Sequence, residues 1–267
     1  MNDTQWKAFC DFKKDFKAMI QQWSSVVPNL TELQKKAALQ AKTPEYPFEN
    51  TVVYNNDLEK ITKEDEIKLI VIGDNPGKDE QLNKNCRYLC GQAGKIAEGY
   101  FKRNPVLGVD FRKNVIILNK TPVHSAKTAQ LRTIMKDGGQ KVADLILESQ
   151  LWMAEHTALL HKQLVENADN GACIPELWLV GYSELKGKGF FVPYRDMLQK
   201  TYLNGDGTGS GDGRTWEKVY VFQHFSMNRF TIDLDDFIKQ NELQKKNLET
   251  QIHMLGTVHK KEIFISQ

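Results

Sequence analysis

The feature that most constrains the fold is a set of four short, apolar, β-branched runs spread along the chain. They cover residues 67–73, 114–119, 176–181 and 218–223. Near-continuous apolar character is typical of strands that are buried on both faces of a parallel sheet. Helical patterns separate or follow these runs, at about 93–102, 139–165 and 237–249. This alternation predicts a three-layer α/β/α domain around a four-stranded, mainly parallel central sheet.

The first 56 residues have a different pattern from the rest of the chain. Aromatic and apolar side chains recur at helical spacing between Trp6 and Trp23, which indicates a helix packed on a core. A second helix is expected at about 31–42, before prolines break the pattern. We therefore predict an N-terminal helical extension at 1–56 that packs on an α/β domain at 57–267.

Composition narrows the class of protein without identifying a partner. The chain has 36 Lys and Arg residues against 34 Asp and Glu residues, a formal net charge of +2. Any contact with nucleic acid must therefore come from a local basic surface. Four cysteines are too few for a disulfide framework. No apolar run approaches the ~20 residues of a membrane span, and the N-terminus lacks the pattern of a secretory signal. We expect a cytoplasmic protein with reduced thiols and no membrane partner.

The segments that directly follow the predicted strands carry the candidate chemistry, because ligands of parallel α/β sheets bind beyond the carboxyl ends of the strands. The first strand runs into GDNPGKDE (73–80), whose glycines and proline force a turn. A second turn, RYLCGQAG (87–94), opens into a helix whose free N–H groups suit an anion. The second strand ends at Asn119, which can donate to and accept from a base edge. The fourth strand ends in QHFSMNR (223–229).

In this order, the motifs resemble those of the uracil-DNA glycosylase superfamily. GDNPGKDE is similar to the family's first motif, which is GINPG in mismatch-specific members and GEAPG in the thermostable iron–sulfur members. CRYLCGQAGKIAEGYF is similar to the PFVGRAG-type segment of the iron–sulfur branch. NKTP stands where the family places its base-recognising Asn, and HFSMNR resembles its HPS-type second motif. The resemblance covers about 67–230 and implies a monofunctional DNA glycosylase of base-excision repair, which flips a damaged base and hydrolyses its N-glycosidic bond.

The resemblance also implies roles for individual residues. Asn75 matches the Asn of GINPG and would position the attacking water. Asp74 matches the Glu of GEAPG and is a close alternative, as a general base or as a group that stabilises the sugar cation. Asn119 would select uracil over cytosine, and His224 would donate to the base oxygen as negative charge builds there.

Further contacts are expected from the same turns. Substrate contacts are expected from Gly73, Pro76, Gly77, Tyr88 and Leu89. DNA contacts are expected from Gly91, Gly94, Ser226, Met227, Asn228 and Arg229. Tyr88 or Leu89, which precede the CGQAG turn, would stack on the base.

The sequence departs from the family pattern at several positions. Aligning GQAG on GRAG places Leu89, rather than Tyr88, at the family's stacking Phe. Phe225 stands where Pro is usual, and Met227 lies beside the position of the family's wedge Leu. An iron–sulfur cluster needs four thiolates, but Cys10 stands alone and no Cys follows the second strand. We therefore expect neither a cluster nor any other metal or cofactor.

Three further features lie outside these motifs. The Gly/Asp-rich stretch 204–213 predicts a flexible surface loop. The polar segment 124–127, with its His, Ser and Lys, is expected on the surface near the DNA backbone. His156 and His161 miss the i, i+4 spacing of a shared metal face and are expected to be solvated.

Two other functions stay open. The altered second motif and the near-neutral charge also suit a non-catalytic member of the fold that binds nucleic acid or protein. The same strand ends would equally serve an enzyme that acts on free nucleotides or nucleosides. For the leading hypothesis, a monomer acting on DNA that contains a damaged base, uracil is the family's usual substrate and hypoxanthine or xanthine are alternatives.

Overall fold

The sheet at the centre of the molecule has four parallel strands. The computed structural model describes residues 1–203 and 214–264. The strands are β1 (Leu69–Gly73), β2 (Val115–Asn119), β3 (Glu176–Val180) and β4 (Val219–Phe222). Their order is β2-β1-β3-β4, and every neighbouring pair is parallel. The predicted strand positions and the parallel sheet are confirmed, while the loop predicted at 204–213 lies outside the described residues.

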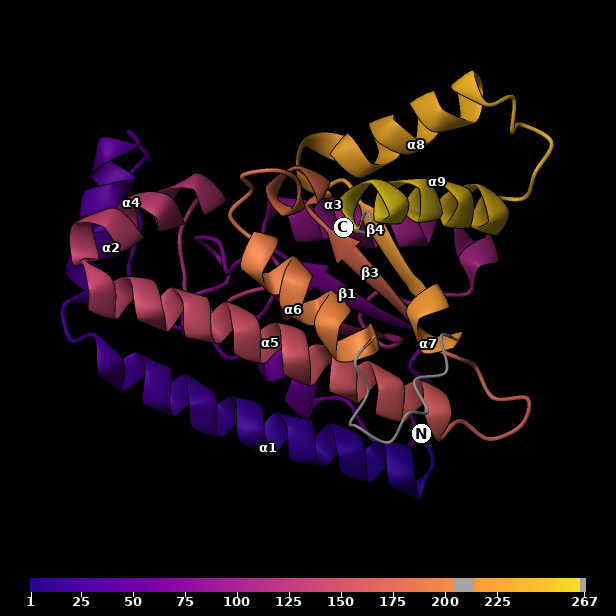
Figure 1. The fold of residues 1–267 in the computed structure, drawn as a ribbon, viewed down its shortest axis with the longest axis horizontal. Helices are drawn as coiled ribbons and strands as arrows, with labels where there is room; N and C mark the ends of the chain where they lie inside the picture. The colour runs from indigo at the N-terminus through magenta and orange to yellow at the C-terminus, as the bar shows by residue number, and fades with distance from the viewer. Residues whose placement is uncertain (204–213, 265–267) are drawn as a thin grey trace.

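Helices flank this sheet, as Figure 1 shows, with α5 and α6 toward one face and α3 and α9 toward the other. The helices are α1 (Asp3–Val26), α2 (Leu30–Gln40), α3 (Gln92–Arg103), α4 (Thr128–Gly138), α5 (Gln140–Glu166), α6 (Val192–Leu203), α7 (Arg214–Glu217), α8 (Arg229–Gln240) and α9 (Leu248–Ile263). In the parts of the chain that the structure describes, none of them has both the length and the apolar character to cross a bilayer.

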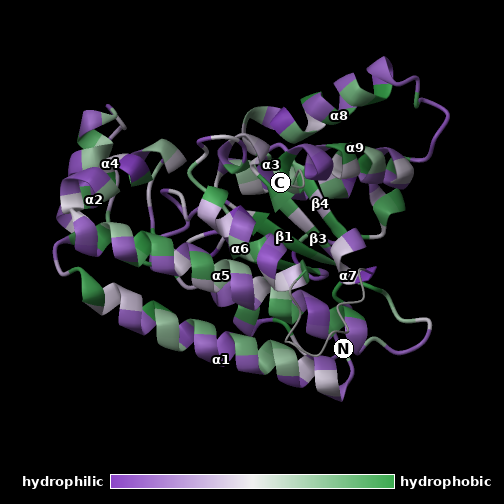
Figure 2. Cartoon of the chain, viewed as in Figure 1, coloured by the Kyte–Doolittle hydropathy of each residue, from purple (hydrophilic) through white to green (hydrophobic). Residues whose placement is uncertain are grey.

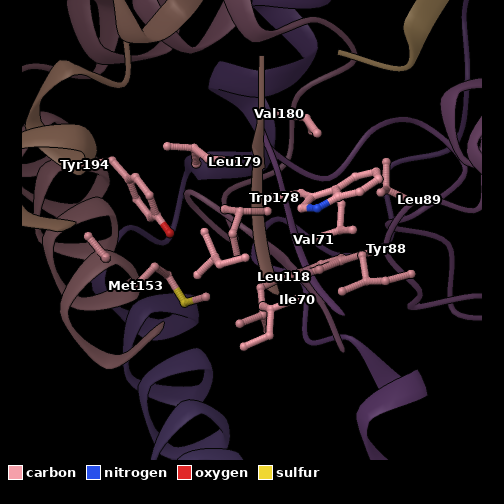
Figure 3. Close-up of a cluster of buried hydrophobic side chains, with 14 of the residues drawn as sticks. Ile70, Val71, Tyr88, Leu89, Leu118, Met153, Trp178, Leu179, Val180 and Tyr194 are labelled. Carbon is pink, nitrogen blue, oxygen red and sulfur yellow. The ribbon is translucent and has the colours of Figure 1, made fainter. Parts of the chain in front are cut away.

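The strands are apolar because both of their faces are covered. Figure 2 shows them as the green centre of the molecule, surrounded by helices of mixed colour. Successive side chains of a strand point to opposite faces, and β3 illustrates this. Trp178 packs against Phe101 of α3 and Phe230 of α8, with ring centroids 5.6 Å and 5.8 Å away. Leu179 points the other way, toward Met153 and Tyr194 (Figure 3).

The N-terminal helices pack on the same body. Figure 1 shows α1 lying along α5 and α2 beside α4. Trp152 of α5 lies against Phe16 and Trp23 of α1, with ring centroids 5.8 Å and 5.7 Å away. The chain then joins the segment after β2 through backbone bonds, including Val53 N–H to the Pro122 carbonyl at 2.9 Å. The division into an N-terminal extension and an α/β domain, with its boundary at residue 56, stays a prediction.

The helix predicted at 237–249 is wrong. Helix α8 ends at Gln240 and α9 begins only at Leu248. The chain turns between them, with Glu242 in the left-handed region at φ 53°. Asn247 then caps α9 by accepting a hydrogen bond from the backbone N–H of Thr250 at 2.8 Å. The apolar residues Ile238, Leu243 and Leu248 are five apart, a spacing that does not continue the helical period across this turn.

Candidate functional site

The carboxyl ends of the strands open into a cavity of about 810 Å³. Each strand contributes lining residues at or just after its end. They are Asp74 and Asn75 after β1, Asn119 at the end of β2, Gly181 after β3, and His224 after β4. The structure thus brings together Asp74, Asn75 and His224, which the sequence assigned to catalysis, and Asn119, which it assigned to base selection.

Asp74 is paired with Lys120, a residue to which the sequence assigned no role. Lys120 directly follows β2, yet its side chain is completely buried. Its Nζ lies 2.5 Å from Asp74 Oδ1 and 2.6 Å from the carbonyl oxygen of Val180. Burial lowers the pKa of Lys120, and the neighbouring Asp74 carboxylate opposes that effect. Asp74 Oδ2 is left with one weaker neighbour, Thr128 Oγ1 at 3.3 Å.

Asn75 is held in place by the segment that opens α4. Its Nδ2 donates to the carbonyl oxygen and to Oγ of Ser125, both at 3.0 Å, and its Oδ1 accepts from Thr128 Oγ1 at 3.0 Å. The amide hydrogens are therefore engaged within the protein. The carbonyl oxygen keeps acceptor capacity for a ligand, because an amide oxygen has two lone pairs.

Asn119 is buried with an unused donor. Its side chain is 1% exposed, and Nδ2 has no hydrogen-bond partner among the described residues. A buried amide donor without a partner costs about 1–3 kcal/mol. Because Asn119 lines the cavity, a ligand in the cavity can supply the missing acceptor.

His224 is held in one tautomer. The backbone N–H of Ser226 donates to Nδ1 at 3.1 Å, so Nδ1 is an acceptor and the proton of the neutral ring lies on Nε2. Within residues 1–203 and 214–264, no group is bonded to Nε2. Burial lowers the pKa of His224, with Lys120 acting in the same direction and Asp74 against it. The ring is therefore a neutral donor at the cavity.

A second carboxyl group, Glu80, lies in the same wall. Its side chain is buried and lies within hydrogen-bond reach of the backbone N–H groups of Gly77 and Leu89. Burial raises the pKa of Glu80 to about 8, against the effect of those two N–H groups and of Arg112. Glu80 links the turn after β1 to the turn before α3. The sequence motifs predicted no role for Glu80.

The remaining predicted residues divide into two groups. Those that line the cavity are Gly77, Leu89, Gly91, Ser226 and Arg229. Those that are not among its lining residues are Gly73, Pro76, Tyr88, Gly94, Met227 and Asn228. Met227 stands out in the second group because its apolar side chain is 81% exposed on a short 3₁₀ turn, Ser226–Asn228.

Tyr88 and Gly94 have structural positions. The Tyr88 ring is completely buried and its hydroxyl donates to the Val53 carbonyl at 2.5 Å, so of the two residues only Leu89, itself 3% exposed, is among those that line the cavity. A Cβ on Gly94 would lie 1.5 Å from the Leu89 carbonyl oxygen. Glycine at this position lets α3 approach that turn closely.

Two predictions about polar residues are wrong. His124 and Ser125 are buried, not on the surface, and only Lys127 of that segment is exposed. His124 Nδ1 contacts the Pro76 carbonyl oxygen at 2.8 Å, so the ring fixes the turn after β1. His161 is also completely buried, with both ring nitrogens bonded. His156, which was also predicted to be solvated, is partly buried and stacks on Trp152.

The rim of the cavity carries charges of both signs, because Asp79 and Glu184 lie among its lining residues together with three cationic side chains. Lys78, Lys127 and Arg229 lie among its lining residues and are exposed. The first residues of α3 and α4 line it too, and neither helix has a side-chain cap at its N-terminus. Uncapped N-termini present free N–H groups and a positive dipole end.

One group of side chains in the described part of the chain has metal-ligand spacing. Glu176, Glu249 and His253 offer ligand atoms that lie within 4.8 Å of one another. They stand at the amino end of β3, away from the cavity, and His253 Nε2 already lies 2.6 Å from Glu176 Oε1. This group therefore belongs to a different end of the molecule from the predicted site.

Comparison of the chain with protein-family models, curated proteins and solved structures finds no match. The case for function therefore depends on the cavity and its side chains.

Proposed function

We propose that this protein is a DNA glycosylase that hydrolyses the N-glycosidic bond of a flipped-out uracil or related deaminated base. The observation that carries the proposal is the convergence of Asp74, Asn75, Asn119 and His224 on one cavity, with donors at Asn119 and His224 that no described residue uses. A uracil-DNA glycosylase-like three-layer arrangement is part of the same proposal.

The two unused donors, Asn119 Nδ2 and His224 Nε2, recognise the base. Asn119 offers an amide that can both donate and accept, which suits the edge of a base carrying a carbonyl and an N–H. His224 Nε2–H donates to a carbonyl oxygen of the base, where negative charge grows as the bond breaks. Leu89 supplies an apolar surface for the ring. A base reaches these groups only after it leaves the helix stack.

Asp74 and Asn75, the two residues after β1, carry out the cleavage. A water held by Asn75 Oδ1 and Asp74 Oδ2 attacks C1′ of the sugar, the C1′–N bond breaks, and its electron pair leaves with the base. The proton of the water passes to the Asp74 carboxylate. Hydrogen bonds to Ser125 and Thr128 keep Asn75 fixed while this occurs.

Lys120 supports a monofunctional enzyme. A glycosylase that also cuts the strand uses an amine as its nucleophile. The Lys120 ammonium is completely buried and its hydrogens face Asp74, Val180 and Gly73. It is therefore not placed to attack a sugar, and water is the nucleophile of the proposed reaction.

The residues at the rim of the cavity bind the DNA strand. The cationic side chains of Lys78, Lys127 and Arg229 and the N-termini of α3 and α4 suit backbone phosphates. Met227 projects beside them and suits an apolar wedge that enters the base stack.

The test is a base-release assay on oligonucleotides that carry uracil opposite G, opposite A or in a single strand, or hypoxanthine. Wild type is compared with Asn75→Ala, Asp74→Ala and His224→Ala, and abasic sites are nicked with alkali. We expect release by wild type and a loss of about 10²–10³-fold in each variant. Salt-dependent oligonucleotide binding without release would contradict the proposal and indicate a binding protein, and turnover of mononucleotides alone would indicate a nucleotide enzyme.

A further inference from the structure

Lys120 is an uncommon feature at the edge of a cavity, because a lysine is rarely buried completely without a specific partner. Its Nζ faces three acceptors from two neighbouring strand ends. These are Asp74 Oδ1 at 2.5 Å, the Val180 carbonyl at 2.6 Å and the Gly73 carbonyl at 3.3 Å. The Phe191 ring lies 4.9 Å away and covers the ammonium on another side. Each of the three hydrogens of the Lys120 ammonium thus has an acceptor.

The same arrangement divides the two oxygens of Asp74. Oδ1 is taken by Lys120, while among the described residues Oδ2 is reached only by Thr128 Oγ1 at 3.3 Å. Thr128 has a single hydroxyl hydrogen and lies closer to Asn75 Oδ1, at 3.0 Å. Asp74 and Thr128 both line the cavity. One oxygen of the carboxylate is therefore anchored, and the other is available on the cavity side.

Gly181 completes the arrangement. It follows β3 with φ 97°, and a Cβ there would lie 2.4 Å from Asp74 Oδ1 and 3.2 Å from Lys120 Nζ. Any side chain at this position would push the carboxylate off its anchor. The three residues thus form one unit, which we call the Asp74 anchor: Asp74, Lys120 and Gly181.

We propose that Lys120 is a positioning residue that binds one oxygen of Asp74 and so holds the other oxygen where it accepts a proton from the attacking water. This inference rests on the proposed glycosylase function. It also selects Asp74, rather than Asn75, as the residue that takes the proton, because the Asn75 amide cannot.

A lysine that merely ties strand ends together makes a different prediction from one that acts through Asp74. A structural tie would lower activity and affinity together and would do so whether or not Asp74 is present. A positioning residue lowers the rate of bond cleavage at saturating DNA, and its removal has no further effect once Asp74 is gone.

The experiment is a double-mutant cycle with Lys120→Met, Asp74→Asn and the double variant, in single-turnover base release from oligonucleotides. The rate at saturation and the half-saturating protein concentration are measured separately. Gly181→Ala moves the carboxylate without removing a charge, and it gives a second approach if Lys120→Met fails to fold. Lys141→Met, at an exposed lysine of α5, is the matched control.

We expect Lys120→Met and Gly181→Ala to lower the saturating rate by about 10²-fold, the cost of a misplaced catalytic group, with half-saturation and the Lys141→Met control unchanged. The double variant should be no slower than Asp74→Asn. Effects that multiply in the double variant, or a matching loss of affinity, would overturn the inference alone. A wild type that releases no base would overturn the proposed function and this inference with it.

Discussion

Two polar side chains at the amino end of the central sheet, His161 and Glu176, are fully paired, whereas Asn119 and His224 at the carboxyl end are not, although Lys120 beside them is. At the amino end, His161 uses both ring nitrogens, one against the Tyr202 hydroxyl at 2.6 Å and the other against the Pro175 carbonyl at 2.9 Å. Glu176 likewise pairs with His253 and accepts from the Trp178 indole. At the carboxyl end, within the part of the chain that the structure describes, Asn119 Nδ2 has no partner and His224 is bonded only through Nδ1.

This difference separates stability from function. A satisfied polar group adds to the stability of the fold, whereas a buried donor without a partner costs about 1–3 kcal/mol. A protein keeps such a cost where a ligand supplies the missing partner. The amino end is therefore expected to respond to mutation in stability, and the carboxyl end in activity.

The largest expected effect is at Asn119. Leucine has nearly the same shape but no donor, so Asn119→Leu should lower base release by about 10³-fold, in line with losses at sites that hydrogen-bond their substrate. The unfolding free energy should stay the same or rise by about 1 kcal/mol, because an unpaired donor is removed. Single-turnover rates and urea unfolding measure the two effects. A strongly destabilised variant would show that Asn119 has a structural partner.

The next effect compares two histidines. His224→Gln removes the Nε2–H donor and should lower the rate by about 10²-fold, as loss of one oxyanion donor does, with little change in melting temperature. His161→Gln should do the reverse, lowering the melting temperature and leaving the rate per folded molecule unchanged. Equal changes in rate and in melting temperature for the two variants would contradict the proposed difference between the ends of the sheet.

The sequence reveals the strands and the residues at their ends better than it reveals polar side chains buried by distant parts of the chain. Apolar runs located all four strands, and their order placed Asp74, Asn75, Asn119 and His224 at the strand ends. Lys120 and His161 were missed because each is buried by distant parts of the chain, Lys120 against Val180 and His161 against Tyr202. Polar residues that close such contacts have the same local pattern as surface residues. Spacing alone does not distinguish them.

A pH dependence of stability follows from the two fully bonded histidines. Burial lowers the pKa of His124 and of His161 to about 4, from 6.5. Between these values the unfolded chain binds protons that the folded chain does not, so stability is complete above pH 6.5 and is lost as pH falls toward 4. Each histidine should contribute about 3 kcal/mol to that loss.

The histidine contribution is measured by denaturant unfolding at several pH values. The double variant His124→Gln, His161→Gln should be less stable at pH 7 and should lose less stability on acidification than wild type. An unchanged slope between pH 6.5 and 4 would contradict the assignment of both rings as neutral in the fold.

The smallest expected effect is at Met227. Its side chain is 81% exposed, so Met227→Ala should change the unfolding free energy by less than about 0.5 kcal/mol. If the side chain enters the base stack, affinity for a duplex should fall by about 10-fold, the low end of the cost of losing a stacking contact. Affinity for a single strand should change less. Equal losses on both substrates would argue against a wedge.

Detection of the free base tests directly whether the carboxyl end of the sheet cleaves a base from DNA. Wild-type protein is incubated in excess with oligonucleotides containing uracil, hypoxanthine or xanthine, and the released base is identified by mass spectrometry. We expect one free base per cleaved site with an intact abasic strand, and none from Asn119→Leu on the same time scale. Oligonucleotide binding with no free base from any substrate would contradict it.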